Sequence, residues 1–300
     1  MIWSPGVTYS IVALDPQTGE LGVAVQSHWF SVGPIVPWAC PGVGAVATQA
    51  NVDASYGPRL LDLLAAGVEA PAALERLVAA DSGARGRQVA VVDASGRVAA
   101  FTGGECMPFA GDAGGDGVSC QANIMASAAV WGAMLDAFER AQGQRLQDRL
   151  LAALDAAEAV GGDIRGRQSA AILVVPAAGE PWESTVSLRV EDDPEPLVEL
   201  RRLLVIHDAY VLAGEGDALA GERRYEEASR LYRDAAALAP DSLELRFWAG
   251  LGAAQLGDLD AGIAAVGEVI ARSPGWGELI ARLSDDVMPS VSAVRAGLAA

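Results

Sequence analysis

Ser27 and His28 are adjacent residues whose types suit chemistry on a substrate. They close a strand-like apolar segment, residues 20–27. An imidazole in such a place can donate a hydrogen bond to a substrate or assist proton transfer near neutral pH, so the pair could open a cyclic amide. A structural histidine between Ser27 and Trp29 explains the same position, and both interpretations stay open.

Side-chain amides stand at two further places, the end of one predicted strand and a stretch between a predicted loop and a predicted helix. Gln49 and Asn51 end one strand, whereas Gln121 and Asn123 follow a glycine-rich stretch, 103–117, and precede a predicted helix. Such amides can hold a substrate or stabilise the oxyanion of acyl transfer, and Asn123 is the preferred donor. The structural alternatives are helix capping for Asn123 and ordinary polar strand ends for Gln49 and Asn51.

Asp163, Arg165 and Arg167 form a short polar cluster just before another predicted strand. Guanidinium groups bind carboxylates in bidentate fashion, so the two arginines could hold an acidic substrate group. The same three residues could instead form an internal ion pair that fixes the loop. The spacing does not distinguish the two roles.

The charge composition excludes several classes of function. The chain carries 39 acidic and 21 basic residues, a net charge of −18, and every basic residue is arginine. A lysine Schiff base, a phosphate-loop lysine and a lysine general base are therefore excluded. Nucleic acid is not an expected partner, because an acidic chain repels phosphate backbones. A content of 51% hydrophobic and 20% charged residues also excludes disorder as the main state.

Cysteine and histidine are too few for a disulfide framework or a recognisable metal site. The three cysteines are Cys40, Cys106 and Cys120, and the two histidines are His28 and His207. No metal or cofactor is expected from them, and a reducing cytoplasm is the expected location. No run of 18 apolar residues predicts a membrane span, and the opening M-I-W-S-P-G-V does not resemble a secretory signal.

The elements that must position these side chains come in groups. Residues 8–14 and 20–27, joined by D-P-Q-T-G, predict a hairpin, and their continuous apolar runs indicate strands covered on both faces. Further elements are predicted as a strand over 43–49, helices after Pro58 and Pro71, a hairpin over 87–103, helices over 127–141 and 146–160, strands over 169–175 and 185–190, and a helix after Pro196. This order favours two stacked sheets with helices on both outer faces over a doubly wound parallel sheet.

The remainder of the chain has a different pattern. Aligning residues 209–240 with 243–274 brings Gly216 onto Gly250 and Pro240 onto Pro274. A period of 34 residues, with small residues where helices cross, is typical of tetratricopeptide repeats. The second unit is degenerate, and an ordinary helical bundle is the alternative.

Several long segments of the first two thirds resemble the DUF1028 family, a branch of the N-terminal nucleophile (Ntn) hydrolase superfamily. The segments are T-Y-S-I-V-A-L-D-P-Q-T-G-E-L-G-V-A-V-Q-S-H-W-F (8–30), G-V-G-A-V-A-T-Q-A (42–50), S-Y-G-P (55–58), S-C-Q-A-N-I-M (119–125), G-G-D-I-R-G-R-Q-S-A-A-I-L-V-V (161–175) and L-R-V-E-D-D-P-E-P (188–196). The resemblance implies an α+β fold, a four-layer αββα sandwich over residues 8–205. It leaves residues 1–7 as an extension or pro-segment and 206–300 as a small all-α, tetratricopeptide-like domain.

The resemblance also assigns a role to Thr8, which alone would be no more than a strand-start residue. Superfamily members hydrolyse amides with a Thr, Ser or Cys at the mature amino terminus. A hydroxyl is a poor nucleophile without a base, and an α-amino group with an ordinary pKa of about 7.7 to 8.0 supplies one. Thr8 stands where similar chains begin, so it would be nucleophile and base together.

Two departures from the family pattern bear on this role. Residues 1–7 would acylate the nitrogen of Thr8, so the expected enzyme starts at Thr8, either after cleavage or because Val7 marks the true gene start. The lysine that tunes proton transfer in proteasome-like members is missing. Arginine cannot replace it as a base, although it can anchor a carboxylate.

The expected function is therefore cofactor-free hydrolysis of a small amide or related C–N bond. Thr8 and Asn123 would act at the reacting atoms with help from His28. The substrate contacts would be Ser27, Gln49, Asn51, Gln121, Asp163, Arg165 and Arg167. The alternative is a catalytically silent Ntn-like scaffold whose helical tail recruits partners. A homo-oligomer is expected, and the tail could bind a protein partner.

Overall fold

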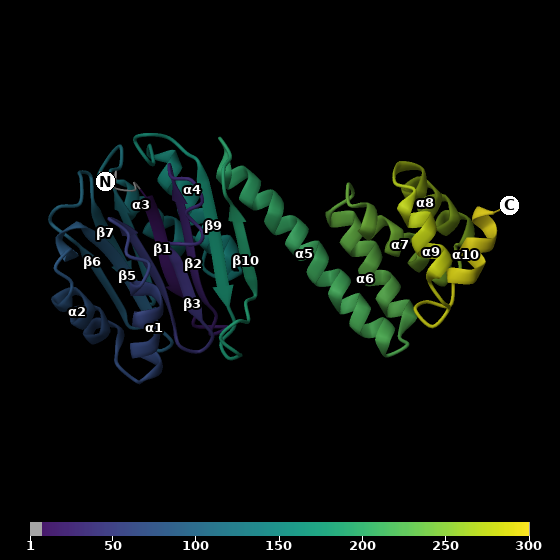
Figure 1. Ribbon diagram of the computed structural model, residues 1–300, viewed down its shortest axis with the longest axis horizontal. Coiled ribbons are helices and arrows are strands. Elements are labelled where there is room, and N and C mark those ends of the chain that lie inside the picture. Colours follow the sequence, from purple (N-terminus) through teal and green to yellow (C-terminus); the bar gives the residue numbers. More distant parts are fainter. Residues whose placement is uncertain (1–7, 300) are drawn as a thin grey trace. The chain divides into compact units, whose positions relative to one another are not determined.

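A computed structural model describes residues 8–299 of the chain. The chain divides into two compact units, Met1–Arg201 and Arg202–Ala300. The first unit contains two antiparallel sheets with helices, and the second is helical (Figure 1). Helix α5 (Pro196–Gly221) begins in the first unit and continues into the second.

The strands of the first unit form sheet I and sheet II. Sheet I has the order β10 (Val186–Val190), β9 (Ser169–Val175), β2 (Leu21–Ser27), β1 (Thr8–Leu14), β8 (Val118–Asn123) and β7 (Gly111–Gly115). Sheet II has the order β3 (Pro37–Cys40), β4 (Gly44–Ala50), β5 (Arg87–Asp93) and β6 (Val98–Thr102). All neighbouring strands are antiparallel, so the doubly wound parallel alternative is excluded.

Four layers stack in the first unit because the central strands are apolar on both faces. Residues of β1, β2, β4 and β5 are buried almost without exception, and one apolar cluster fills the space between the sheets. Helices α1 (Tyr56–Ala65) and α2 (Ala70–Ala80) cover sheet II, and α3 (Val130–Arg140) and α4 (Leu146–Ala159) cover sheet I. The prediction of two stacked sheets between outer helices is confirmed for the order of the layers.

Two local predictions were wrong. The stretch 103–117 is not loop throughout, because Gly111–Gly115 form β7, where the missing side chain of Gly111 leaves room for the Trp131 ring. Gln121 lies inside β8 and Asn123 is its last residue, and α3 begins only at Val130 with Ala129 as its N-cap, so Asn123 does not cap a helix. The short strand β3 was not predicted; it starts at a proline, as edge strands tolerate.

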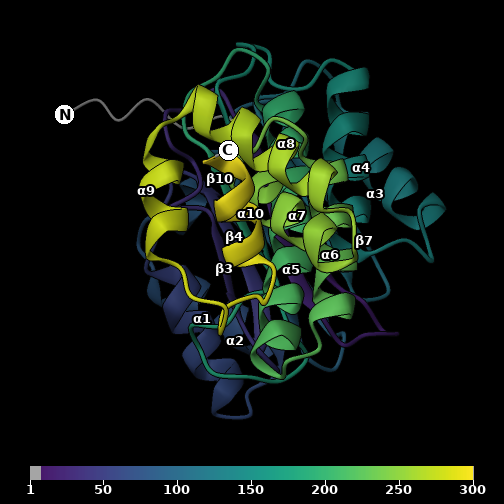
Figure 2. The same ribbon diagram turned by 90° about the vertical axis from the view of Figure 1, so that its right-hand side faces the viewer.

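The second unit contains the helices α6 (Tyr225–Leu238), α7 (Leu243–Gln255), α8 (Leu259–Arg272), α9 (Gly275–Arg282) and α10 (Val291–Leu298). Helices α6, α7 and α8 lie side by side (Figure 2) around a shared apolar cluster. No helix among residues 8–299 is long and apolar enough to cross a membrane.

The 34-residue period corresponds to a repeated contact between helices. A Cβ placed on Gly216 would lie 2.8 Å from the Tyr232 ring, and one on Gly250 would lie 3.0 Å from Val266. Gly250 follows Gly216 by 34 residues, and Val266 follows Tyr232 by the same number, which is the predicted period. Assignment of these helices to the tetratricopeptide class stays a prediction.

Candidate active site

Thr8 is the first residue of β1, in the interior of sheet I. It pairs with Ser27 of β2 on one side and with Asn123 of β8 on the other. Its side chain is only 3% exposed, and Oγ1 donates a hydrogen bond to Ser27 Oγ at 3.1 Å. The antiparallel pairing thus brings three predicted site residues, far apart in sequence, to one end of the sheet.

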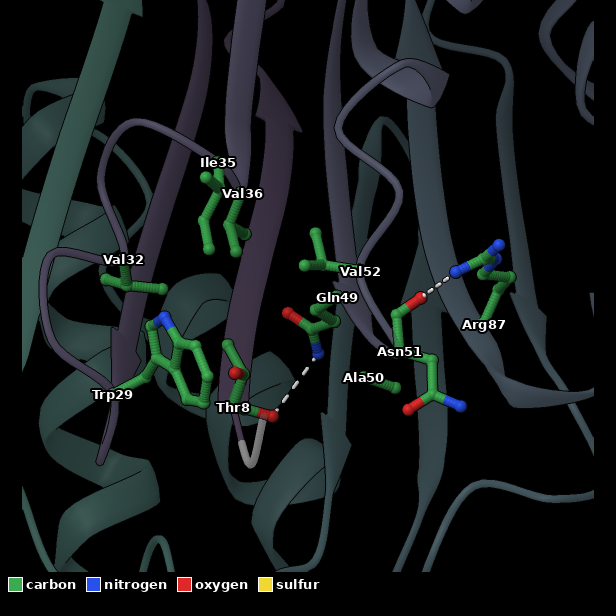
Figure 3. Close-up of a pocket in the computed structure, with 10 residues that line it drawn as sticks. All are labelled: Thr8, Trp29, Val32, Ile35, Val36, Gln49, Ala50, Asn51, Val52 and Arg87. Atoms are coloured by element: carbon green, nitrogen blue, oxygen red, sulfur yellow. Dashed lines mark hydrogen bonds between the residues drawn. The ribbon is translucent and has the colours of Figure 1, made fainter. Parts of the chain in front are cut away.

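A cavity of about 330 Å³ opens next to Thr8 (Figure 3). One wall is apolar and comes from the segment after β2, and the other is more polar and comes from sheet II and the loop after β4. The lining residues are Thr8, Trp29, Val32, Ile35, Val36, Gln49, Ala50, Asn51, Val52 and Arg87. A small molecule fits a cavity of this size and mixed polarity.

Neutral side-chain amides hold the backbone of Thr8 beside the cavity. Gln49 Nε2 donates to the Thr8 carbonyl oxygen at 3.2 Å and to Gln88 Oε1 at 2.8 Å. Asn123 Nδ2 donates to the same two acceptors, at 3.4 Å and 3.0 Å. Gln88 Nε2 in turn donates to the carbonyl oxygen of Ala122 at 2.9 Å. The network ties sheet I to sheet II at the strand end that carries Thr8.

Gln121 extends this network deeper between the sheets. Its Nε2 donates to Ser10 Oγ at 2.6 Å, and Ser10 Oγ donates to Gln49 Oε1 at 2.6 Å. These side chains are fully or almost fully buried. Neither Gln121 nor Asn123 lines the cavity, so the structure places both in the support of Thr8 and its neighbours.

One acceptor of the network has no partner. Asn123 Oδ1 is buried and makes no hydrogen bond to any residue that the structure describes. A buried amide oxygen without a donor costs free energy, on the order of 1–3 kcal/mol. The orphan oxygen belongs to the residue paired with Thr8, so it marks a place where a further donor would be stabilising.

Backbone strain gathers around the same strand ends. Ser31 (φ 58°), Ala50 (φ 65°) and Ile124 (φ 57°) adopt left-handed conformations without being glycine. Ala50 lines the cavity, and Ile124 follows Asn123 directly. Such conformations cost of order 1–3 kcal/mol each and concentrate at functional sites.

Arg87 supplies the positive charge at the cavity. Its Nε lies 2.9 Å from Asp81 Oδ2, and Nη1 donates to the carbonyl oxygen of Asn51 at 2.5 Å. The hydrogen bond from Arg87 is the main reason why the pKa of Asp81 is lowered. Tyr56 also donates to Asp81, and burial raises the pKa of Tyr56 to about 12. The guanidinium is therefore held in a fixed position at the cavity wall.

His28 and the predicted cluster around Asp163 form a separate group. Asp163 Oδ2 accepts from the His28 backbone N–H at 2.9 Å, and Asp163 Oδ1 accepts from the Arg165 backbone N–H at 2.8 Å. His28 Nδ1 lies 3.3 Å from the carbonyl oxygen of Arg167, whose Nε contacts Glu158 Oε2 at 2.9 Å. None of the four side chains predicted there lines the Thr8 cavity. The contacts fix the loop before β9.

Sequence reasoning missed much of the cavity wall. Trp29 and Arg87 were not predicted as site residues, although Trp29 belongs to the first quoted segment. No spacing signal identifies Val32, Ile35, Val36 or Val52, because they are apolar residues that also fit a core. Gln88, at the centre of the amide network, carried no signal except its position in a strand.

The three cysteine thiols ionise less readily than free thiols. Burial raises the pKa of each of the thiols Cys40, Cys106 and Cys120, which lowers their thiolate fraction. No group of three or more histidine, cysteine or acidic side chains in that range is arranged to hold a metal ion.

Comparisons with known proteins agree with the architecture of the first unit. Residues 8–200 match the model of a family described as "Family of unknown function (DUF1028)". A crystal structure of a DUF1028 protein from Silicibacter pomeroyi is 34% identical in sequence. The match covers 66% of this chain and 84% of that one, with a TM-score of 0.61.

A structure of Anbu (ancestral beta-subunit) from Yersinia bercovieri also matches, at 10% identity over 65% of this chain and 92% of that one. Its TM-score is 0.34. No curated protein matches the sequence. The family match over most of the first unit and the 34% identical structure show that this chain belongs to the DUF1028 family.

Proposed function

We propose that this protein is an N-terminal nucleophile hydrolase that cleaves a small amide or related C–N bond, with Thr8 as nucleophile. The observation that carries the proposal is the Thr8 side chain at the wall of a cavity large enough for a small molecule. The proposal requires removal of residues 1–7, which lie outside the described residues. Removal would give Thr8 a free α-amino group, the base that its hydroxyl needs.

The proposed reaction has two halves. The Thr8 hydroxyl oxygen attacks the amide carbon while the α-amino group takes the hydroxyl proton. Collapse of the tetrahedral intermediate breaks the C–N bond, and the leaving amine takes that proton. Water then attacks the resulting ester, and the α-amino group of Thr8 takes a proton from that water. Cleavage of the ester releases the acid, and the proton returns to the Thr8 oxygen. No cofactor takes part in this scheme.

The surroundings of Thr8 suit this reaction in three ways. The amides of Gln49 and Asn123 hold the Thr8 carbonyl oxygen, which fixes the first residue of β1. The orphan oxygen Asn123 Oδ1 would accept an N–H of the freed amino group and so orient it. Arg87 and Asn51 at the opposite wall would contact polar groups of the substrate.

The test begins with the amino terminus of the native protein. Intact mass should show material that starts at Thr8. Periodate cleaves a residue that carries neighbouring hydroxyl and amino groups to an aldehyde, so an aminooxy probe should then label the protein. Thr8→Ala is the matched control and should remain unlabelled.

Activity is measured on the same material with a panel of small amides, by release of ammonia or amine. Thr8→Ala should lower the rate roughly 1000-fold or more, because the nucleophile is lost. Active protein with residues 1–7 still attached would overturn the proposal. Correctly started protein that hydrolyses nothing in the panel would favour the alternative, a silent scaffold with a partner-binding tail.

A further inference from the structure

A second cavity lies at the other end of β1. It has a volume of about 410 Å³, and Leu14, the last residue of that strand, is part of its lining. Thr8 and Leu14 are separated by the length of the strand, roughly 20 Å at about 3.3 Å per residue. The cavity is therefore distinct from the one beside Thr8.

Arg149 of α4 lines this cavity and is unusual in its surroundings. The residue is only 8% exposed, and its Nε is buried with no hydrogen-bond partner among residues 8–299. Its guanidinium carbon lies 3.9 Å from the centre of the Phe138 ring. Burial lowers the pKa of Arg149, while the charge of Asp15 raises it. A buried guanidinium N–H without an acceptor is costly, so an acceptor on a ligand would be favoured there.

Carboxylates outnumber this cation around the cavity. Asp15 is buried at the inner side, and Asp116 and Glu139 are exposed. A simple anion would meet three like charges, and a simple cation would leave Arg149 unpaired. A ligand that carries both charges satisfies both sets of groups. The remaining wall includes apolar side chains, among them Leu14, Val118 and Phe138.

We propose that this cavity binds a small apolar zwitterion of the free α-amino acid type. Its carboxylate pairs with Arg149, its ammonium group with the surrounding carboxylates, and its side chain with the apolar wall. The site does not depend on the chemistry of Thr8, and it gives the first unit a second binding function beside the proposed hydrolysis.

The binding test uses L-leucine and two analogues that each lack one charge, on the full chain by isothermal titration calorimetry. The analogues are 4-methylpentanoate, without the ammonium group, and L-leucinamide, without the carboxylate. L-Leucine should bind at least tenfold more tightly than either analogue. Equal binding of all three, or no binding of L-leucine at millimolar concentration, would contradict the proposal.

Variants locate the site. Arg149→Met keeps a long side chain over Phe138 but removes the charge, so L-leucine binding should be lost while the melting temperature rises. Arg140→Met, an exposed arginine of the neighbouring helix, is the matched control and should change neither. Thr8→Ala should leave L-leucine binding unchanged, which separates this site from the first cavity. A fall in melting temperature of Arg149→Met with binding retained would show that Arg149 is structural.

Discussion

The interior beside Thr8 and the interior of the helical unit bury different kinds of side chain. Between the sheets, Gln49, Gln88, Gln121 and Asn123 are buried and bonded to one another, to buried serines or to backbone. The core cluster of the helical unit consists of aliphatic and aromatic residues, with glycines at close helix contacts. Apolar packing is sufficient to hold helices together, whereas a buried amide network imposes directed contacts on a particular backbone. The directed contacts lie in the first unit, around the candidate site.

The largest effect on stability is expected where the network is cut. Gln88→Leu removes the acceptor shared by Gln49 and Asn123 and the donor to the Ala122 carbonyl. The free energy of unfolding should fall by about 3 kcal/mol, because several buried polar groups lose partners. Urea denaturation measures it. The control in the helical unit is Ser229→Ala, a buried serine bonded only to its own helix at Tyr225, with an expected loss of about 1 kcal/mol or less. Equal losses of unfolding free energy in the two variants would show that buried polar contacts matter no more between the sheets than in the helical unit.

A moderate effect is expected from filling the repeated glycine contact of the helical unit. Gly250→Val forces side-chain atoms against Val266 and Ala265 and should lower the free energy of unfolding by about 2 kcal/mol. Gly214→Ala is the control, since a Cβ there meets nothing within 4 Å. That variant should gain up to about 1 kcal/mol from helix propensity. The expectation fails if both substitutions act in the same direction.

The smallest effect concerns the ion pair that holds Arg87 at the cavity. The pKa of Asp81 is lowered in the folded protein, mainly by the hydrogen bond from Arg87. A lowered pKa adds stability that is present above the ordinary value of 3.8 and is lost as the pH falls below it. The melting temperature of Asp81→Asn should therefore lie below that of the wild type near neutral pH. This difference should shrink below about pH 4, and a difference that grows on acidification would contradict the assignment.

Much of the element order could be predicted from local patterns. The segments 8–14 and 169–175 coincide with β1 and β9, because continuous apolar, β-branched runs have few alternatives in a folded chain. β7 escaped prediction, since glycine has no side chain to produce a pattern, and its strand is defined by pairing with β8. β3 escaped because a short edge strand is stabilised by its neighbour and not by its own composition.

The amino-acid sequence by itself determined the residue types of the site: a threonine at the start of a strand, amides at strand ends and arginine as the basic residue. It could not determine which of them meet. The register of β1 between β2 and β8 sets Thr8 beside Ser27 and Asn123, and the stacking of sheet II adds Gln49, Gln88 and Arg87. The same fold keeps the side chains of His28 and Asp163 out of the cavity lining. Strand pairing and sheet stacking join residues that are distant along the chain, so only the tertiary structure decides these contacts.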